Sequence, residues 1–337
     1  MRASVLRGTK DIVIEERPRP RPGPNEVLVR VDSVGICGSD VHYYEHGRIG
    51  RFVVESPLVL GHEASGVIEE IGSDVGSLRL GQRVSVEPGV PDLTCPQCLA
   101  GRYNLCPDMR FFATPPIDGA FVEYVVVHAA FAHPIPDDIS DDAAALLEPL
   151  SVGVWACRKG GVTAGSRVLI TGAGPVGLVS LQTALAFGAH EVVVSDINPS
   201  RLALAREFGA TQTVDPRTGG LHDLTAPPDV LLECSGFPPA IADGIRALDR
   251  AGRAVLVGMG GDEVPLPLSV IQERELTVTG TFRYANTWPT AIGLVASGRV
   301  NLDRLVTGSY GLGHVEEALT AGRRDEQTVK VMVHPHA

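Results

Sequence analysis

The chain has 337 residues, of which 44% are hydrophobic and 20% are charged. This composition excludes a disordered or fibrous protein, and the length suits two domains better than a single core. The formal net charge of −11 disfavours nucleic acid and anionic membrane surfaces as partners.

The N-terminal residues 1–7 are interrupted by charge before any apolar core of signal-peptide length appears. No later apolar run is long enough to span a bilayer. We therefore expect a cytoplasmic protein that has no contact with a membrane.

The first part of the chain is predicted to be mainly β. Residues 26–32 and 64–71 are short, rich in β-branched side chains and bounded by glycine or proline, which is typical of strands and turns. Residues 17–22 alternate arginine with proline and are interpreted as a short linker, with a basic interaction motif as the alternative.

From about residue 150 the pattern changes to strands that alternate with helices. The predicted strands are residues 167–171, 191–195, 230–233, 254–257 and 276–279. The predicted helices are residues 176–187 and 199–208, the second with a proline at its start. This alternation predicts a doubly wound parallel sheet.

Residues 329–333 form the last predicted strand. We predict that residues 1–150 and 284–337 form one discontinuous domain and that residues 151–283 form the other. Periodicity alone does not show that the tail returns to the first domain.

A glycine-rich turn follows the strand at residues 167–171. Gly172, Gly174 and Gly177 match the G-x-G-x-x-G pattern, with Pro175 and Val176 at the start of the predicted helix. The glycines permit a tight turn, close approach of a pyrophosphate and close helix packing, and the helix N-terminus attracts phosphate. A glycine-rich turn in an unrelated α/β protein is the alternative.

Asp196 closes the next strand, about 20 residues after the last glycine, where an acid accepts hydrogen bonds from the adenosine ribose. Its charge would repel a 2′-phosphate and therefore favours NAD. Arg201 lies near in sequence and would accommodate NADP, which is the alternative cofactor.

Three potential zinc ligands lie in two short motifs. His62 and Glu63 follow Gly61 in the pattern G-H-E-x-x-G-x-x-x-x-x-G-x-x-V, and Cys37 lies upstream in G-I-C-G-S-D. Thiolate, imidazole and carboxylate all bind zinc. Taken singly, Cys37 could be a buried thiol and His62 a loop histidine, but together they indicate a metal site.

These motifs resemble the zinc signature of medium-chain dehydrogenases, and residues 34–50 are similar to the sorbitol and xylitol dehydrogenase family. The resemblance covers nearly the entire chain. It implies a GroES-like, mainly-β catalytic domain plus a doubly wound Rossmann domain, NAD, zinc, a small polyol substrate, and a homotetramer with a dimer as the alternative.

The resemblance also implies roles for individual residues. A catalytic zinc is held by Cys37 and His62 with Glu63 or Glu148, and the sequence does not decide between the two carboxylates. A proton leaves through Ser39, the cofactor ribose and His42, or through Glu148 and its water. Further cofactor contacts are expected at Val257, Met259, Thr281 and Arg283.

Substrate contacts are implied at Tyr43, Phe111, Glu148, Arg283 and Tyr284. A structural salt bridge or a cofactor contact is the alternative for Arg283. Such a site discriminates against analogues that lack a hydroxyl because its donors would be left unpaired.

A second metal site is predicted from Asp92, Cys95, Cys98 and Cys106, which keep the family's four-ligand spacing with aspartate at the first position. Structural zinc accepts a carboxylate oxygen. Three free thiols are the alternative. Cys157 and Cys234 stand alone and are interpreted as buried thiols.

The sequence therefore predicts a zinc-dependent polyol 2-dehydrogenase that produces a ketose and NADH. Arabinitol, galactitol or threonine dehydrogenase activity is a close alternative because the zinc chemistry would be identical. From another class, an NAD-binding protein without turnover is the remaining alternative.

Overall fold

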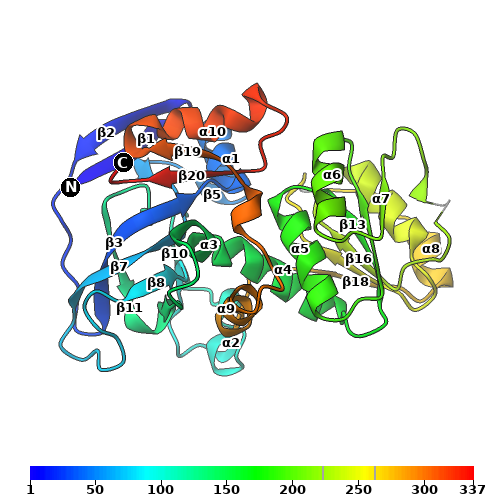
Figure 1. The fold of residues 1–337 in the computed structure, drawn as a ribbon, viewed down its shortest axis with the longest axis horizontal. Helices are drawn as coiled ribbons and strands as arrows, with labels where there is room; N and C mark the ends of the chain where they lie inside the picture. The colour runs from blue at the N-terminus through cyan, green and yellow to red at the C-terminus, as the bar shows by residue number, and fades with distance from the viewer. Residues whose placement is uncertain (222–223, 262) are drawn as a thin grey trace. The chain divides into compact units, whose positions relative to one another are not determined.

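The protein is described by a computed structural model that covers residues 1–221, 224–261 and 263–337. The chain divides into two compact units (Figure 1). The first contains Met1–Glu148 and Leu302–Ala337, and the second contains Pro149–Asn301.

The first unit is built on a large mixed sheet. Its strands in spatial order are β12 (Ala132–Pro134), β8 (Arg83–Val86), β7 (Glu63–Ile71), β3 (Glu26–Gly35), β20 (Lys330–His334) and β19 (Val306–Gly311), and β11 (Tyr124–His128) also pairs with β3. Alternate valines of β3 contribute to its core. The C-terminal strand β20 pairs antiparallel with β3, so the tail does return to the first unit.

Smaller sheets complete this unit. One contains β2 (Asp11–Glu16), β1 (Arg2–Gly8) and β6 (Leu58–Val59), and two-stranded pairs join β4 (Arg48–Ile49) to β5 (Phe52–Val53) and β9 (Gly89–Val90) to β10 (Arg110–Phe111).

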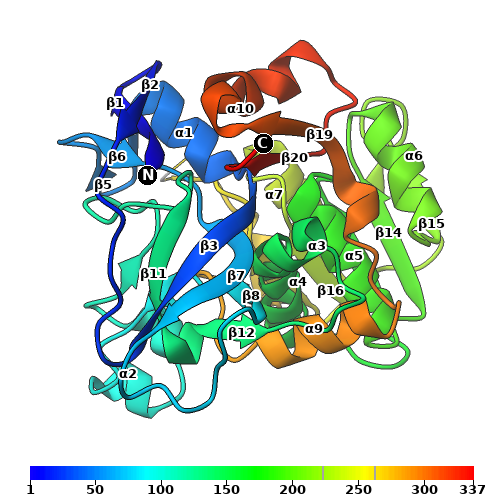
Figure 2. The ribbon, with the colours of Figure 1, turned by 60° about the vertical axis from the view of Figure 1, so that its left-hand side comes forward.

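Short helices pack against these sheets. Helix α3 (Asp141–Ala145) lies beside β3 and β7 (Figure 2). Helix α10 (Val315–Arg324) lies against β19 and β20, and it also contacts α1 (Gly38–His46), the helix that follows β3 (Figures 1 and 2).

The second unit contains a wholly parallel sheet in its described part. Its spatial order is β15 (Gln212–Val214), β14 (Glu191–Ser195), β13 (Arg167–Thr171), β16 (Val230–Glu233), β17 (Arg253–Leu256) and β18 (Thr277–Gly280). The helices of this unit are α4 (Leu147–Gly160), α5 (Pro175–Ala186), α6 (Pro199–Glu207), α7 (Pro238–Ala247), α8 (Leu268–Glu273) and α9 (Trp288–Ala296). The predicted doubly wound sheet is confirmed, and its order reverses direction at β13.

The division into units differs from the sequence prediction at its second boundary. We placed residues 284–301 with the first domain, whereas the structure groups them with the second unit. Arg158 of α4 donates hydrogen bonds to Asn286 O at 2.8 Å and to Thr290 Oγ1 at 2.7 Å. Gln182 of α5 accepts a hydrogen bond from Asn301 N at 2.7 Å. These bonds attach residues 284–301 to the helices of the second unit. The periodicity of the sequence does not indicate them, because they join side chains that are distant in the chain.

Within the described residues, none of the helices combines the length and the apolar character that a bilayer crossing needs.

Candidate metal centres and cofactor cavity

The strand pairing of the first unit brings Cys37, His62 and Glu63 together. Gly35, the last residue of β3, lies opposite Glu63, the first residue of β7. Cys37 follows β3 directly and His62 precedes β7, so both lie at the same end of the strand pair. The thiol, imidazole and carboxylate ligand atoms all lie within 4.8 Å of one another.

A buried lysine holds the carboxylate of this cluster. Lys330 Nζ donates a hydrogen bond to Glu63 Oε1 at 2.6 Å and another to Ile36 O at 2.7 Å. Glu63 Oε2 lies 2.5 Å from the same nitrogen but accepts no well-aligned hydrogen bond from the described residues. A Cβ at Gly35 would lie 2.0 Å from Glu63 Oε2, so only glycine leaves room for the carboxylate.

The charges around Lys330 keep it protonated. Burial by itself lowers the pKa of Lys330, but the Glu63 carboxylate and the side chains of Cys37 and Glu148 raise it, and the net pKa lies above its usual value. Lys330 is therefore a cation that faces three potential metal-binding side chains.

Asp40 orders the two loops that carry the cluster. It is wholly buried in the first turn of α1. Its Oδ2 accepts a hydrogen bond from Cys37 N at 3.0 Å, and its Oδ1 accepts one from Gly61 N at 2.9 Å. Oδ1 also lies 3.7 Å from His62 Nδ1, the position of an outer carboxylate that orients a ligating histidine.

The protonation of His62 depends on the same neighbours. Burial lowers the pKa of His62, but the nearby Asp40 carboxylate and Cys37 raise it, and the net pKa is well above the usual value. A metal ion that binds the ring must therefore displace a proton.

The other predicted catalytic and substrate residues of the first unit lie at different depths. Glu148, near the start of α4, is buried and interacts electrostatically with Lys330. Phe111 is buried, and its ring centroid lies 5.7 Å from that of His62. Tyr43 is buried in α1, whereas His42 is exposed and its ring lies 4.7 Å from that of His46. Ser39, half-buried, lies in the first turn of α1.

A second cluster lies in one loop. The ligand atoms of Asp92, Cys95, Cys98 and Cys106 all lie within 4.8 Å of one another. Cys95 precedes the short helix α2 (Pro96–Leu99), and its Sγ lies 3.5 Å from that of Cys98. Asp92 N donates to Cys106 Sγ at 3.4 Å, which brings the two ends of the loop together.

The electrostatics of this loop suit a cation. Asp92 Oδ1 accepts hydrogen bonds from Cys95 N at 2.9 Å and Thr94 N at 2.8 Å, and these bonds lower the pKa of Asp92. Desolvation and the neighbouring Cys95 and Asp92 side chains raise the pKa of Cys98 to about 12. Four crowded donors with these properties match the ligand set of a closed structural zinc site.

The predicted glycine-rich turn begins directly after β13. Gly172 has a φ of +91°, and a Cβ at Gly177 would lie 1.9 Å from Gly172 O. Gly174 precedes α5, which begins at Pro175, and Val176 follows in its first turn. The turn therefore has the close approach between helix and strand that a dinucleotide fingerprint needs.

Asp196 lies at the carboxyl end of β14, beside this turn. Its Oδ2 accepts a hydrogen bond from Ala173 N at 2.6 Å, and its Oδ1 accepts one from Asn198 N at 2.7 Å. Arg201 is half-buried in α6, and its Nε is buried without a hydrogen-bond partner in the described part of the chain.

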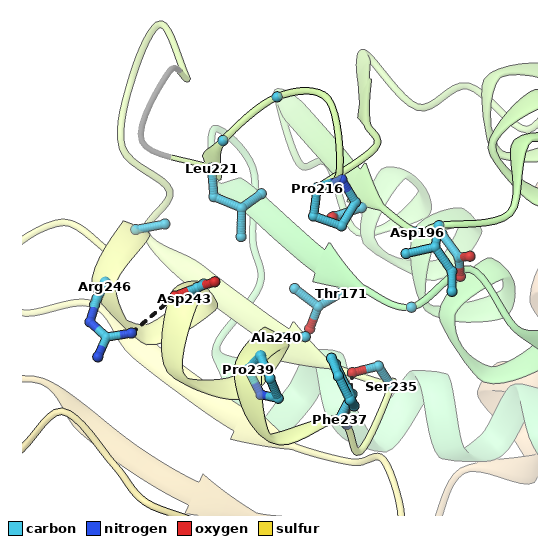
Figure 3. A pocket seen from close by; sticks show the side chains of 16 residues that line it. Thr171, Asp196, Pro216, Leu221, Ser235, Phe237, Pro239, Ala240, Asp243 and Arg246 are labelled. Carbon is cyan, nitrogen blue, oxygen red and sulfur yellow. Dashed lines mark hydrogen bonds and ion pairs between the residues drawn. The ribbon is translucent and has the colours of Figure 1, made fainter.

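A cavity of about 550 Å³ opens at the carboxyl ends of β13, β14 and β16, where the strand order reverses. Asp196 lies at one end of this cavity and the Asp243–Arg246 ion pair at the other (Figure 3). Gly172 and Asp196 are the predicted cofactor residues that line it.

The remaining predicted residues of the second unit lie further along the chain. Val257 N donates to Glu233 O, and Thr281 N donates to Leu256 O. Met259 is 58% exposed. Arg283 has a φ of +55° and its guanidinium lies over the Phe282 ring, while Tyr284 is buried against Trp288.

Sequence reasoning missed several residues of these sites. The sequence did not identify Lys330 as a site residue, because its partner Glu63 is distant in the chain. Asp40 was part of a quoted motif, and an acid in the first turn of a helix is a recognisable capping signal. The cavity walls at Ser235 and Phe237 follow a strand that was predicted, but the sequence did not show that they face a ligand.

The comparisons with known proteins agree with this geometry. Residues 23–137 match the alcohol dehydrogenase GroES-like domain, and residues 175–297 match the zinc-binding dehydrogenase domain. The chain is 49% identical to sorbitol dehydrogenase of Macaca fascicularis over 94% of this chain and 90% of that protein. It is 46% identical to sorbitol dehydrogenase of Gallus gallus over 98% and 95% of the two chains.

A solved structure of L-idonate 5-dehydrogenase from Escherichia coli superposes with a TM-score of 0.93 at 33% identity, covering 99% of this chain and 97% of that one. This likeness extends through both units, so it confirms the predicted pairing of a GroES-like domain with a Rossmann domain. The chain therefore belongs to the zinc-binding, medium-chain dehydrogenases with a GroES-like domain, in the sorbitol dehydrogenase family.

Proposed function

We propose that this chain is a zinc-dependent, NAD-linked dehydrogenase that oxidises a secondary hydroxyl of a sugar alcohol to a ketose. The observation that carries the proposal is the cluster of half-buried Cys37 with buried His62 and Glu63, whose ligand atoms lie within 4.8 Å of one another. Membership of the sorbitol dehydrogenase family supports the substrate class.

The residues of the cluster fit a catalytic zinc. The donors are a thiol, an imidazole and a carboxylate, and three protein ligands leave a position for water or substrate. The three ligand atoms lie within 4.8 Å of one another, and Lys330 holds the buried Glu63 carboxylate beside the other two donors. Glu148 remains the alternative third ligand, because Lys330 interacts with both carboxylates.

A zinc ion bound by these residues would supply a Lewis acid that lowers the pKa of a hydroxyl, as zinc lowers the pKa of bound water to roughly 7. Asp40 orients His62 for this task, and Lys330 holds the Glu63 carboxylate. The buried Phe111 ring packs beside the His62 imidazole.

The proton released from the substrate needs a path to solvent. The route that we propose passes through Ser39, the cofactor ribose and His42, and the exposure of His42 on α1 supports its role as the last group before solvent. Glu148 with a water molecule is the alternative relay. An unchanged pH profile of turnover in His42→Ala would contradict the first route.

The cofactor assignment depends on Asp196. Its carboxylate lies beside the glycine-rich turn, in the cavity at the carboxyl ends of the strands, and its charge favours NAD over NADP. Arg201 would contact the same part of the cofactor. Arg283 and Tyr284 are assigned to substrate hydroxyls, with a cofactor contact as the alternative for Arg283.

We assign a structural zinc to Asp92, Cys95, Cys98 and Cys106, because their four ligand atoms lie within 4.8 Å of one another. A homotetramer, or a dimer, formed by pairing of cofactor domains stays a prediction, as does the cytoplasmic location.

A substrate panel that follows NADH absorbance tests the function. Sorbitol, xylitol, arabinitol, galactitol and threonine are compared with zinc, after chelation, and after zinc is restored. We expect turnover with a polyol that disappears with chelation and returns with zinc. Absence of turnover with every polyol, despite bound zinc and NAD, would favour the NAD-binding protein without turnover. Turnover with threonine alone would favour threonine dehydrogenase activity.

A further inference from the structure

Glu233 is a buried carboxylate that neither metal cluster includes. It is the last residue of β16 and has no solvent exposure. Across residues 1–221, 224–261 and 263–337 it forms no ion pair, and its carboxylate is held by hydrogen bonds. A buried carboxylate without a cation destabilises the fold unless its oxygens accept several hydrogen bonds.

The donors come from the turn that follows β16 and from the end of β13. Ser235 N donates to Glu233 Oε1 at 2.9 Å, and the Ser235 hydroxyl donates to the same oxygen. Gly236 N lies 3.1 Å from Oε1 and 3.2 Å from Oε2. Thr171 Oγ1 donates to Oε1 at 3.3 Å. The carboxylate therefore fastens the turn at residues 234–236 back onto its own strand and onto β13.

The loops after β13 and β17 pack so closely against this turn that their backbones have little room to move. Gly236 has a φ of +67°, and a Cβ there would lie 2.1 Å from Met259 O. A Cβ at Gly172 would lie 2.9 Å from Ser235 N. The backbone carbonyl of Glu233 accepts hydrogen bonds from Val257 N and Gly258 N, both at 2.8 Å. The loops after β13, β16 and β17 are thus packed against each other around Glu233.

Two of these loops form a wall of the cavity. Thr171, Gly172, Ser235 and Phe237 line it, and Figure 3 shows Ser235 and Phe237 next to one another below Thr171. Ser235 Oγ also accepts a hydrogen bond from Phe237 N at 3.1 Å. A chain of hydrogen bonds therefore runs from Glu233 through Ser235 to Phe237, the residue before α7.

We infer that Glu233 is a positioning residue for the adenosine half of the cofactor: its carboxylate sets the wall formed by Ser235 and Phe237 before the cofactor binds. This inference rests on the proposed function, because it takes the cavity to be the NAD site. If this wall is already ordered before binding, no part of the binding free energy is lost in ordering it, and the cofactor binds more tightly.

Glu233→Gln tests the inference because it keeps the size of the side chain and removes its charge. The amide NH₂ cannot accept from Gly236 N, so the branch of that bond to Oε2 is lost, and the bonds to the remaining oxygen are no longer charge-assisted. We expect the Kd for ADP-ribose, measured by calorimetry, and the KM for NAD to rise about tenfold. The kcat at saturating NAD, the KM for the polyol and the zinc content should stay within about twofold of the wild-type values.

Glu273→Gln is the matched control, since it makes the same chemical change at an exposed position of α8. It should leave both the ADP-ribose affinity and the kinetics unchanged. Ser235→Ala keeps the carboxylate and cuts only the link to Phe237, and we expect about a threefold rise in the same Kd. This second variant decides the question if Glu233→Gln does not fold.

Wild-type ADP-ribose affinity in a folded Glu233→Gln protein would overturn the inference and leave the proposed function intact. Equal losses in kcat and in the affinities for cofactor and polyol would also overturn it, because they indicate general damage. Failure of the wild-type protein to bind ADP-ribose would instead contradict the proposed function and the inference together.

Discussion

The two metal-ligand clusters of the first unit are assembled in different ways. Cys37 and His62 lie 25 residues apart in sequence and meet because β3 pairs with β7. Asp92 and the three cysteines lie within a single loop and meet because that loop closes on itself. The first cluster thus depends on the central sheet, whereas the second depends mainly on local turns.

The clusters also differ in their surroundings. His62 and Glu63 are buried, and Lys330 and Asp40 support them from behind. In the loop cluster Cys106 is buried, while the other three ligands are partly exposed and Asp92 is held by backbone N–H groups. Charged side chains from distant elements thus hold the ligands of the cluster suited to chemistry, whereas backbone groups of the same loop hold Asp92 in the cluster suited to a structural ion.

The largest expected effect follows from Cys37→Ser, which removes a ligand of the sheet-dependent cluster. Losing several kcal/mol of Lewis-acid stabilisation corresponds to a fall in kcat/KM of at least about 10³-fold. Zinc per chain, measured by elemental analysis, should fall by one, while the thermal midpoint changes little because the loop cluster keeps its ion.

Cys157→Ala is the control, because it removes a buried thiol that belongs to neither cluster. It should keep both zinc ions. Full turnover by Cys37→Ser would show that the sheet-dependent cluster is not the catalytic one.

An intermediate effect is expected from Lys330→Met. This change leaves the buried Glu63 carboxylate without its cation, so the free energy of unfolding of the metal-free protein should fall by about 3 kcal/mol in urea titrations. Zinc should bind more tightly in chelator competition, because a positive charge next to the ion has been removed.

Lys10→Met, at an exposed lysine in the same unit, should alter neither quantity. Unchanged zinc affinity in Lys330→Met would contradict the argument that the positive charge of Lys330 weakens zinc binding at this cluster.

The smallest effect is expected from Asp92→Ala in the loop cluster. Loss of one of four ligands weakens zinc binding there, so zinc per chain falls by one and the thermal midpoint falls by several degrees. If this cluster holds a structural ion, as we propose, the kcat should stay within about twofold of wild type. Retention of both ions would show that three cysteines suffice, and a large loss of kcat would contradict the structural role.

Much of the second unit could be predicted because its signals are local. The strands and helices lie within a few residues of their predicted bounds, and the glycine-rich turn and Asp196 are close in sequence and in space. The placement of residues 284–301 was not predictable in the same way. It depends on Arg158 and Gln182, which contact that segment from helices more than a hundred residues away.

The amino-acid sequence by itself determined the alternation of elements, the cofactor fingerprint and the identity of the candidate metal-binding side chains, because each depends on short motifs of neighbouring residues. Only the tertiary structure decided that Lys330 faces Glu63, that Asp40 joins the Cys37 and His62 loops, and that Glu233 braces the cavity wall. The physical reason is that a buried charge must find its partners in three dimensions, and strand pairing and loop packing bring those partners from distant parts of the chain.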